Sequence, residues 1–312
     1  MSTDFSFADA VVLESPKVSV VIPTHNRAKD LGRSIRSVLS QSFMDFELIV
    51  VDDASTDSTE NIVKSFGDPR IRYQKLDNNV GGAEARNIGV GLSSSEIIAF
   101  QDSDDEWRPE KLEKMMALLH RDDSLGGAFS SYIKVNGRRC SIMPNLSEFD
   151  ESNIFESMLK RNVVGTPTLV IRKKVFYEVG GFDSGMKRYQ DWDLAIRLSK
   201  LSKLKMVLEP LVIANTTEGS ISSDVSSHLS ALLRIYEKHG ADIDRSPKLR
   251  AEWLFKRGDA LLRCGDSSGR ALLFRALTRN PVSYKFVILF VSSLFGCSGY
   301  RAVYDYLLRL RN

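Results

Sequence analysis

Short apolar runs alternate with segments of helical periodicity over residues 17–100, and this alternation restricts the fold more than any other feature. A repeating strand and helix order predicts a mostly parallel sheet with helices on both faces. In such a sheet, ligands bind beyond the carboxyl ends of the strands. The predicted strands are 18–22, 46–51, 71–73 and 96–100, and the predicted helices are 28–40, 82–92 and a segment from a cap at Ser55 or Thr56 to about Phe66.

Polar residues follow three of the predicted strands. They are Pro23-Thr24, Asp52-Asp53 and the acidic segment that begins at Asp102. Because the carboxyl ends of parallel strands share one edge of a sheet, we expect these residues to converge on one crevice, although they are far apart in the sequence.

The segment 101–107, QDSDDEW, places four carboxylates directly after the apolar strand 97–100. Carboxylates this close together repel one another and resist desolvation, so they need a cation among them or free access to water. Hard oxygen ligands suit Mg²⁺ or Mn²⁺, and these ions attract phosphates. The segment therefore predicts that a divalent metal holds a phosphate-bearing substrate. The alternative is a solvated acidic turn, which the apolar strand leading into the cluster disfavours.

The composition argues against several classes of protein. The chain has 312 residues, a formal net charge of +3 and the apolar fraction of an ordinary globular protein, so its charge does not argue for a nucleic-acid partner. Its three cysteines are odd in number and widely spaced, which favours a reducing cytoplasm over a disulfide framework. The acidic N-terminal segment lacks the features of a secretion signal. The longest apolar run, 286–295, is shorter than the ~20 residues that a spanning helix needs.

The character of the sequence changes along its length. Residues 1–16 are predicted to be a loose leader, and residues 17–222 an α/β domain. A serine-rich stretch at 220–223 marks the expected boundary. Residues 223–312 contain helical patterns only, which predicts an all-α C-terminal region.

Five sequence blocks follow one another along the chain: VSVVIPTHN at 18–26, SVLSQSF at 37–43, FELIVVDDASTDST at 46–59, NVGGAEARNIG at 79–89 and QDSDDEW at 101–107. In this order and spacing, they resemble the nucleotide-sugar half of family 2 glycosyltransferases. The resemblance covers about residues 17–220 and implies the GT-A fold, a mostly parallel sheet flanked by helices. The chain contains neither GxGxxG nor GxxxxGK[ST], so neither a dinucleotide fold nor a P-loop is supported.

The resemblance implies roles on the donor side. It assigns Asp53 to the imide N–H of a uracil or thymine ring, with Pro23 and Thr24 shaping the base pocket. For Asp53 the alternative is a turn or N-cap aspartate, although Asp52 and Ser55 could supply that cap.

The same resemblance places Gly82 and Arg86 in the nucleotide site; the alternative for Arg86 is a surface position on an amphipathic helix. It makes Asp104 the more direct ligand of Mn²⁺ or Mg²⁺ and Asp102 a ribose or metal contact.

Two further blocks resemble the acceptor half of the family, GGFD at 180–183 and QDWDL at 190–194. They imply that Asp191 is the general base, with Trp192, Phe182 and Asp183 on the acceptor side. The alternatives are that Asp191 and Asp193 are acids of a first helical turn, and that Trp192 and Trp107 are buried. Many relatives have Glu where this chain has Gln190, and the histidine of some relatives is missing from 213–218.

The C-terminal region resembles a single tetratricopeptide-type hairpin over 254–280, followed by the apolar run 286–295. One repeat cannot bury its own face, so we expect it to pack on the catalytic domain, a partner or a membrane. The apolar run with its cations predicts an interfacial helix near anionic lipid. The cations meant here are Lys285, Arg301, Arg309 and Arg311. The alternative is that the apolar run packs onto the main domain.

Taken with the resemblance, the sequence predicts a cytoplasmic, metal-dependent inverting glycosyltransferase, peripheral to the membrane if the last helices bind lipid. Its donor would be a nucleotide-diphosphate sugar, with uridine favoured, and its acceptor a hydroxyl of a glycan or lipid-linked glycan. The alternatives are a catalytically inactive nucleotide-sugar-binding or scaffold protein, and a metal-dependent phosphohydrolase or nucleotidyltransferase. The sequence does not identify the sugar, the acceptor, the linkage or the oligomeric state.

Overall fold

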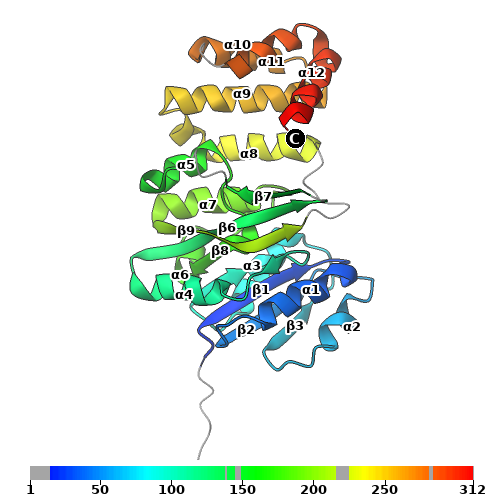
Figure 1. The fold of residues 1–312 in the computed structure, drawn as a ribbon, viewed down its shortest axis with the longest axis vertical. Coiled ribbons are helices and arrows are strands. Elements are labelled where there is room, and N and C mark those ends of the chain that lie inside the picture. The colour runs from blue at the N-terminus through cyan, green and yellow to red at the C-terminus, as the bar shows by residue number, and fades with distance from the viewer. Residues whose placement is uncertain (1–14, 138, 145–148, 216–224, 281–283, 312) are drawn as a thin grey trace, which may run out of the picture.

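The computed structural model describes residues 15–137, 139–144, 149–215, 225–280 and 284–311 (Figure 1). The predicted leader lies almost entirely outside the described residues, and so does the predicted boundary at residue 222. The strands are β1 Val18–Thr24, β2 Phe46–Asp52, β3 Ile71–Lys75, β4 Ile97–Phe100, β5 Glu106–Trp107, β6 Leu125–Asn136, β7 Arg139–Met143, β8 Leu169–Arg172 and β9 Lys203–Asn215. The α-helices are α1 Ala28–Leu39, α2 Thr59–Lys64, α3 Gly82–Leu92, α4 Lys111–Arg121, α5 Ile154–Lys160, α6 Lys173–Glu178, α7 Gln190–Leu201, α8 Val225–Ile243, α9 Pro247–Cys264, α10 Gly269–Arg279, α11 Tyr284–Ser293 and α12 Gly296–Arg311.

One nine-stranded sheet organises the α/β part, with the order β3-β2-β1-β4-β8-β6-β9-β5 and β7 beside β6. The four predicted strands pair in parallel, as the alternating pattern requires. Beyond β4 the sheet becomes mixed, because β8 runs antiparallel to both β4 and β6 while β6 and β9 are parallel. The α/β class is confirmed, and the later strands make the sheet mixed.

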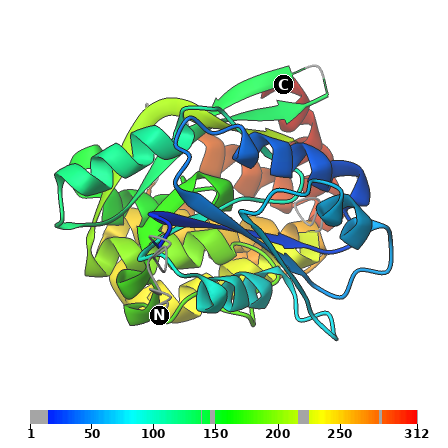
Figure 2. The ribbon, with the colours of Figure 1, turned by 90° about the horizontal axis from the view of Figure 1, so that it is seen from below.

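The side chains of β1 alternate between two cores. Val18, Val20 and Ile22 pack beneath α1, α2 and α4, whereas Val21 belongs to the core beneath α3 and α7. Successive side chains of a strand point to opposite faces, so an uninterrupted apolar strand needs helices on both sides. Figure 2 shows the N-terminal strands with helices to either side of them.

Gly89 allows α3 to approach this sheet closely. A Cβ at this position would lie 2.3 Å from the Val21 side chain, which is too close for any larger residue. The close approach fixes the start of α3 at the carboxyl edge of the sheet.

The cap of α2 differs from the prediction. The helix begins at Thr59, and neither Ser55 nor Thr56 caps it. Instead Asp57 accepts the backbone N–H of Thr59 at 3.0 Å, while Asp52 accepts that of Ser55 at 2.8 Å in the preceding turn. The prediction was wrong because both of these acids compete with the hydroxyl residues for backbone donors.

Helices α8 to α12 form a stack at one end of the molecule, called here the helical module (Figure 1). Its first two helices share a core with the α/β part, in which Trp253 of α9 stacks on Trp192 of α7 at a centroid distance of 5.4 Å. Helices α9 and α10 form the expected hairpin, and the module packs on the α/β part through α8 and α9.

The apolar run of α11 is divided between two environments. Phe286 and Leu289 are buried in the core of the module, whereas Tyr284 is 79% exposed and Phe295, which follows the helix, is 77% exposed. Among the helices described, none is both long enough and apolar enough to cross a bilayer.

Lys111 is a fully buried lysine at the start of α4, and it opposes stability. Its ammonium lies 3.9 Å from the Trp107 ring centroid and has no hydrogen-bond partner in the described part of the chain. Burial lowers its pKa from 10.5 to about 7. The unfolded chain therefore binds this proton more tightly, and the penalty is fully present below pH 7 and disappears as the pH rises toward 10.5.

We expect Lys111→Met to increase the free energy of unfolding at pH 6 by a few kcal/mol, because it removes a desolvated charge while retaining the buried volume. The gain should shrink when the measurement is repeated at pH 9. Urea unfolding measures both values, and Lys174→Met, at a side chain that is 81% exposed, is the control. An equal or negative effect at both pH values would contradict this interpretation of Lys111.

Candidate functional site

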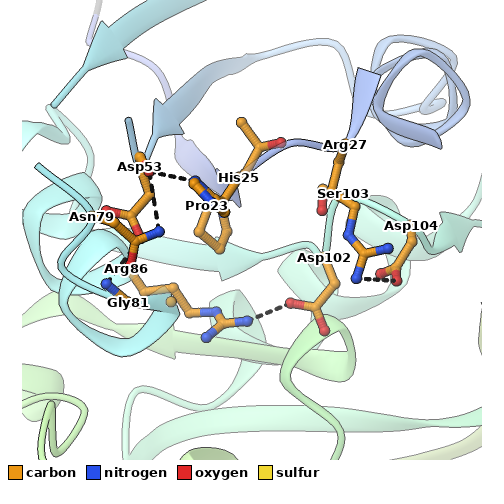
Figure 3. Close-up of a pocket in the computed structure, with 12 residues that line it drawn as sticks. Pro23, His25, Arg27, Asp53, Asn79, Gly81, Arg86, Asp102, Ser103 and Asp104 are labelled. Atoms are coloured by element: carbon orange, nitrogen blue, oxygen red, sulfur yellow. Dashed lines mark hydrogen bonds and ion pairs between the residues drawn. The ribbon is translucent and has the colours of Figure 1, made fainter. Parts of the chain in front are cut away.

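A pocket of about 460 Å³ opens at the carboxyl ends of β1, β2 and β4, and we call it the outer pocket (Figure 3). Since β1 lies between β2 and β4 in the sheet, the residues that follow these strands meet there. All six donor-side residues predicted from the sequence line this pocket, together with Asp104. The six are Pro23, Thr24, Asp53, Gly82, Arg86 and Asp102.

Asp53 is held in a fixed orientation by the loop before α3. Its two carboxylate oxygens accept the backbone N–H groups of Val80 and Gly81 at 2.7 and 2.8 Å. Gly81 adopts φ of +88°, a left-handed conformation that suits glycine. The turn role falls to Asp52, which is buried and accepts the Ser55 N–H and the Tyr73 hydroxyl. Asp53 thus joins the glycine loop to the pocket and retains lone pairs for a ligand.

Arg86 is not a surface residue. Its side chain is 11% exposed, and it donates to Asp102 at 2.6 Å and to the amide oxygen of Gln190 at 3.1 Å. Gln190 in turn donates to the Met186 carbonyl at 2.6 Å. The guanidinium therefore connects the acidic segment after β4 with the first turn of α7 (Figure 3 shows its contact with Asp102).

The acidic segment divides into accessible and buried carboxylates. Asp104 lies 4.0 Å from Arg27, and both line the outer pocket. Asp105 is buried, and burial, with the charges of Asp102 and Asp104, raises its pKa well above its ordinary value. Its carboxylate accepts the backbone N–H of Asn215 at 2.9 Å, so it anchors the end of β9.

The residues present fit a divalent metal. No group of three or more metal-ligating side chains gathers within the described ranges. Asp102 and Asp104 nevertheless border the same two cavities, and Mg²⁺ commonly binds one or two carboxylates together with substrate phosphates and water. This donor set suits a metal that arrives with a diphosphate rather than one held by a closed protein cage.

A second pocket of about 250 Å³, the inner pocket, adjoins the first. Asp102 and Asp104 line both pockets, and Asp191 lines the inner one. The three predicted carboxylates Asp53, Asp104 and Asp191 therefore border one continuous crevice, although the third lies more than eighty residues beyond the second.

Asp191 has the environment of a carboxylate that can exchange a proton near neutral pH. Its Oδ1 accepts the backbone N–H of Trp192 at 2.8 Å and the Asn162 amide at 3.2 Å. Among the residues described, none donates to Oδ2. Burial raises the pKa of Asp191 to about 6, opposed by these two hydrogen bonds and assisted by the Asp102 charge.

The chain turns sharply before Asp191. Tyr189 has φ of +62°, a left-handed conformation that is uncommon outside glycine. Its ring packs edge-on against Trp192, and its hydroxyl lies 2.8 Å from Nδ1 of His228 on α8. Strained residues of this kind persist where the surroundings fix them, here between α7 and the helical module.

Three residues expected on the acceptor side lie outside both pockets. Phe182 is 2% exposed and packs on Phe100 and Phe176, so its role here is in the core. Asp183 pairs with Lys238 of α8 at 2.9 Å. Trp192 is buried, and its indole N–H donates to the Met158 carbonyl.

Asp193 and Trp107 have structural roles, which the sequence had left open. Asp193 is fully buried and contacts Arg197, Lys238 and His239. Burial alone would raise its pKa, but these partners lower it below its ordinary value. Trp107 is also buried, and its indole N–H donates to a backbone carbonyl.

Several pocket residues were not expected from the sequence. His25, Arg27 and Asn79 line the outer pocket, and His25 donates to the Asp53 carbonyl at 2.7 Å. Tyr132 and Lys134 line the inner pocket from β6. His25 and Arg27 follow the end of a predicted strand, and this position could have indicated them. The sequence around the two β6 residues contains no motif that would have indicated them.

Known proteins resemble this chain in sequence. The family model for glycosyl transferase family 2 matches residues 19–180. The amylovoran biosynthesis glycosyltransferase AmsB of Erwinia amylovora is 31% identical over 204 residues, which cover 62% of this chain and 67% of AmsB.

Solved structures share the fold. S. aureus TarS 1–349 in complex with UDP-GlcNAc has a TM-score of 0.61 at 20% identity, covering 94% of this chain and 92% of TarS. The mannosyltransferase PcManGT from Pyrobaculum calidifontis, in complex with GDP-Man and Mn²⁺, has a TM-score of 0.60 at 17% identity, covering 93% and 83%. With the family match over more than half of its length, the chain belongs to glycosyl transferase family 2.

Proposed function

We propose that this glycosyltransferase moves a sugar, with inversion, from a nucleotide-diphosphate donor to a hydroxyl of a glycan or lipid-linked glycan. The observation that carries the proposal is the shared crevice, in which Asp102 and Asp104 separate the outer pocket from the inner pocket that contains Asp191. The outer pocket would hold the nucleotide and the inner pocket the sugar and the acceptor hydroxyl. A uridine donor is favoured by the resemblance of the sequence blocks, while the two structural relatives are complexes with UDP-GlcNAc and with GDP-Man.

In the proposed donor complex, the outer pocket binds the nucleotide through groups of opposite charge. Asp53 would accept the imide N–H of the base next to Pro23 and Thr24, and the guanidinium of Arg86 would lie near the diphosphate. If a divalent metal binds with the donor, Asp102 and Asp104 would hold it, and it would neutralise charge on the leaving diphosphate. The mannosyltransferase relative is a complex with GDP-Man and Mn²⁺, which supports a divalent metal that binds with the donor.

Asp191 would act as the general base. Its Oδ2 would accept the proton of the acceptor hydroxyl while that oxygen forms a bond to the anomeric carbon. The bond between the anomeric carbon and the diphosphate breaks in the same displacement, and the leaving nucleoside diphosphate takes the electron pair. Attack from the side opposite the leaving group inverts the anomeric configuration.

Product analysis tests this function. Incubation with UDP-sugars, Mn²⁺ and a glycan acceptor should release nucleoside diphosphate and form a new glycoside of opposite anomeric configuration. Release of pyrophosphate would indicate a nucleotidyltransferase instead. A protein that binds donors but forms no glycoside with any acceptor would support the inactive binding protein.

The pH profile should report the ionisation of Asp191. Because a base must be deprotonated to act, kcat/KM should fall tenfold per unit as the pH drops below about 6. Asn162→Ala removes a hydrogen bond that favours the ionised form, so it should move this limb to higher pH. A limb near the ordinary aspartate pKa, unmoved by Asn162→Ala, would rule out Asp191 as the titrating base.

The relative AmsB is a biosynthetic glycosyltransferase, and an acceptor in a surface polysaccharide pathway agrees with that name. A lipid-linked acceptor would lie at a membrane. Val287, Ile288 and Val291 of α11 are exposed, and the sequence from 267 to 304 contains five cations and no carboxylate. We therefore propose that this face of α11 contacts anionic lipid.

Vesicle sedimentation tests the lipid contact. The protein should bind vesicles that contain phosphatidylglycerol more tightly than vesicles of phosphatidylcholine alone. Phe295→Ser should weaken binding about tenfold, because burial of a phenylalanine side chain contributes ~1.5–3 kcal/mol. Met44→Ser, at a similarly exposed residue of the α/β part, is the control. Equal binding to both vesicles, unchanged by Phe295→Ser, would contradict the proposal.

A further inference from the structure

A third cavity, of about 650 Å³, lies between the α/β part and the helical module. We call it the module cavity. It is lined by α7 and the segment after α5 on one side, and by α8, α9, α11 and α12 on the other. Neither the family model, which ends at residue 180, nor the motifs of the sequence assign a role to it.

The module cavity begins beside the proposed base. Asn162 and Trp192 line it, and these same two residues donate the hydrogen bonds to Oδ1 of Asp191. Asp191 itself lines the inner pocket, so the carboxylate lies between the two spaces. The module cavity is therefore separated from Asp191 by the two residues that donate to its carboxylate.

The walls of the module cavity are aromatic. Tyr189, Phe255, Phe286 and Tyr304 contribute rings from four helices or helix ends. Pockets that bind small molecules combine such apolar walls with a few polar groups that fix orientation. The volume and the ring content suit one or two sugar units better than a single ion.

The charged groups of the cavity have an excess of cations. Arg161, Lys256 and Lys285 face two carboxylates, Glu252 and Asp259. Burial, with the nearby charges of Arg161 and Lys285, lowers the pKa of Lys256 to about 8, against the effect of Glu252. Arg161 and Lys285 therefore each lie close enough to Lys256 to repel its charge.

One of the two carboxylates is already engaged. Asp259 accepts the Tyr300 hydroxyl at 2.6 Å and lies 3.6 Å from Arg263. Burial raises the pKa of Asp259, and the contacts with Tyr300 and Arg263 oppose this rise. His228, the remaining titratable base, has its pKa lowered to about 4 by burial and by Arg188 and Arg263, so it is neutral at pH 7. The cavity is thus electropositive at neutral pH.

We propose that the module cavity is an acceptor subsite for a glycan that carries an anionic group, a phosphate or a sugar carboxylate, near the hydroxyl that reacts at Asp191. The inference rests on the proposed glycosyltransferase function and specifies its acceptor class. Lys256, whose ammonium also donates to the Lys160 carbonyl, and Lys285 contact the oxyanion as point charges, and the aromatic rings pack on the sugar. The helical module then contributes substrate specificity in addition to packing.

Tryptophan fluorescence can report the binding, because Lys256 lies 5.6 and 5.0 Å from the ring centroids of Trp192 and Trp253. The probes are glucose 1-phosphate, methyl glucuronide and the neutral methyl glucoside, titrated into the full chain with EDTA and saturating UDP. We expect at least one anionic probe to bind about tenfold more tightly than the glucoside. Binding of the phosphate alone identifies a phosphate-bearing acceptor, and binding of the glucuronide alone a uronate. Equal affinity for all three probes overturns the proposal.

Two variants locate the site. Lys256→Met and Lys285→Gln should each weaken the anionic probes about tenfold and leave the glucoside unchanged. Lys285 is exposed, so its variant preserves the fold even if Lys256→Met does not. Lys248→Gln, at an exposed lysine of α9 outside the cavity, is the matched control. If Lys285→Gln binds the anionic probes like the wild type, the inference fails.

Failure of this inference can be distinguished from failure of the proposed function. UDP binding is measured separately on the same samples, and it involves the outer pocket. Tight UDP binding with no preference for anionic probes would overturn the acceptor subsite alone. Absence of UDP binding with any of the candidate metals would instead contradict the proposed donor.

Discussion

Asp191→Asn should lower kcat by a factor of about 10²–10⁴ while changing donor affinity less than twofold, because general-base catalysis contributes about that factor. Asparagine retains the shape and an oxygen for the hydrogen bonds from Trp192 and Asn162. It cannot accept the proton of the acceptor hydroxyl. Steady-state kinetics with UDP-sugar and acceptor, together with calorimetric titration of UDP, separate the two effects.

Asp193→Asn is a useful comparison for this experiment. Asp193 is on the same helical turn but is paired with Lys238 and His239, so its loss should reduce stability rather than remove the base. A folded Asp191→Asn protein that transfers sugar at the wild-type rate would exclude Asp191 as the base.

Asp104→Ala should remove most of the metal-dependent part of donor affinity. Asp104 and Asp102 line both pockets and form the proposed metal-binding pair, so loss of one carboxylate should weaken UDP binding in Mn²⁺ by about tenfold to a hundredfold. In EDTA the wild type and the variant should bind UDP similarly. Calorimetric titrations with and without Mn²⁺ measure the difference.

Asp123→Ala provides the control for Asp104→Ala, since Asp123 is a carboxylate that is 94% exposed and lies outside both pockets. Its UDP affinity should match that of the wild type in both conditions. Equal UDP affinities for Asp104→Ala and wild type in Mn²⁺ would contradict the metal assignment.

The N-terminal half of the fold could be predicted because local pattern and tertiary structure agree there. The strand at Val18–Thr24 is apolar throughout most of its length, and the helices on both faces of the sheet account for this. The same reasoning placed Asp53 and Asp104 at one edge of the sheet. The helix that begins at Gln190 brings Asp191 to the same crevice.

The direction of the later strands could not be predicted. Strand Leu169–Arg172 is as apolar as a parallel strand, but it pairs antiparallel with both of its neighbours. A short buried run has the same composition in either direction, and only the connections before and after it determine the orientation.

The directions in which side chains point were also not predictable from the sequence. Phe182 and Asp183 lie in a block that resembles the family, but one faces the core and the other pairs with α8. The contact between Arg86 and Gln190 joins residues 104 positions apart, and nothing local in the sequence indicates it. The module cavity likewise depends on how α8 to α12 pack, which a pattern of helices leaves open.

The most direct test of the central claim, that distant acids form one donor and catalytic site, is a crystal structure with UDP and Mn²⁺ in which manganese is located by its anomalous scattering. We predict manganese beside Asp102 and Asp104, the uracil ring beside Asp53, and Asp191 facing the far side of the diphosphate. Nucleotide or manganese bound away from this crevice, in a protein that is active in the same conditions, would contradict the account.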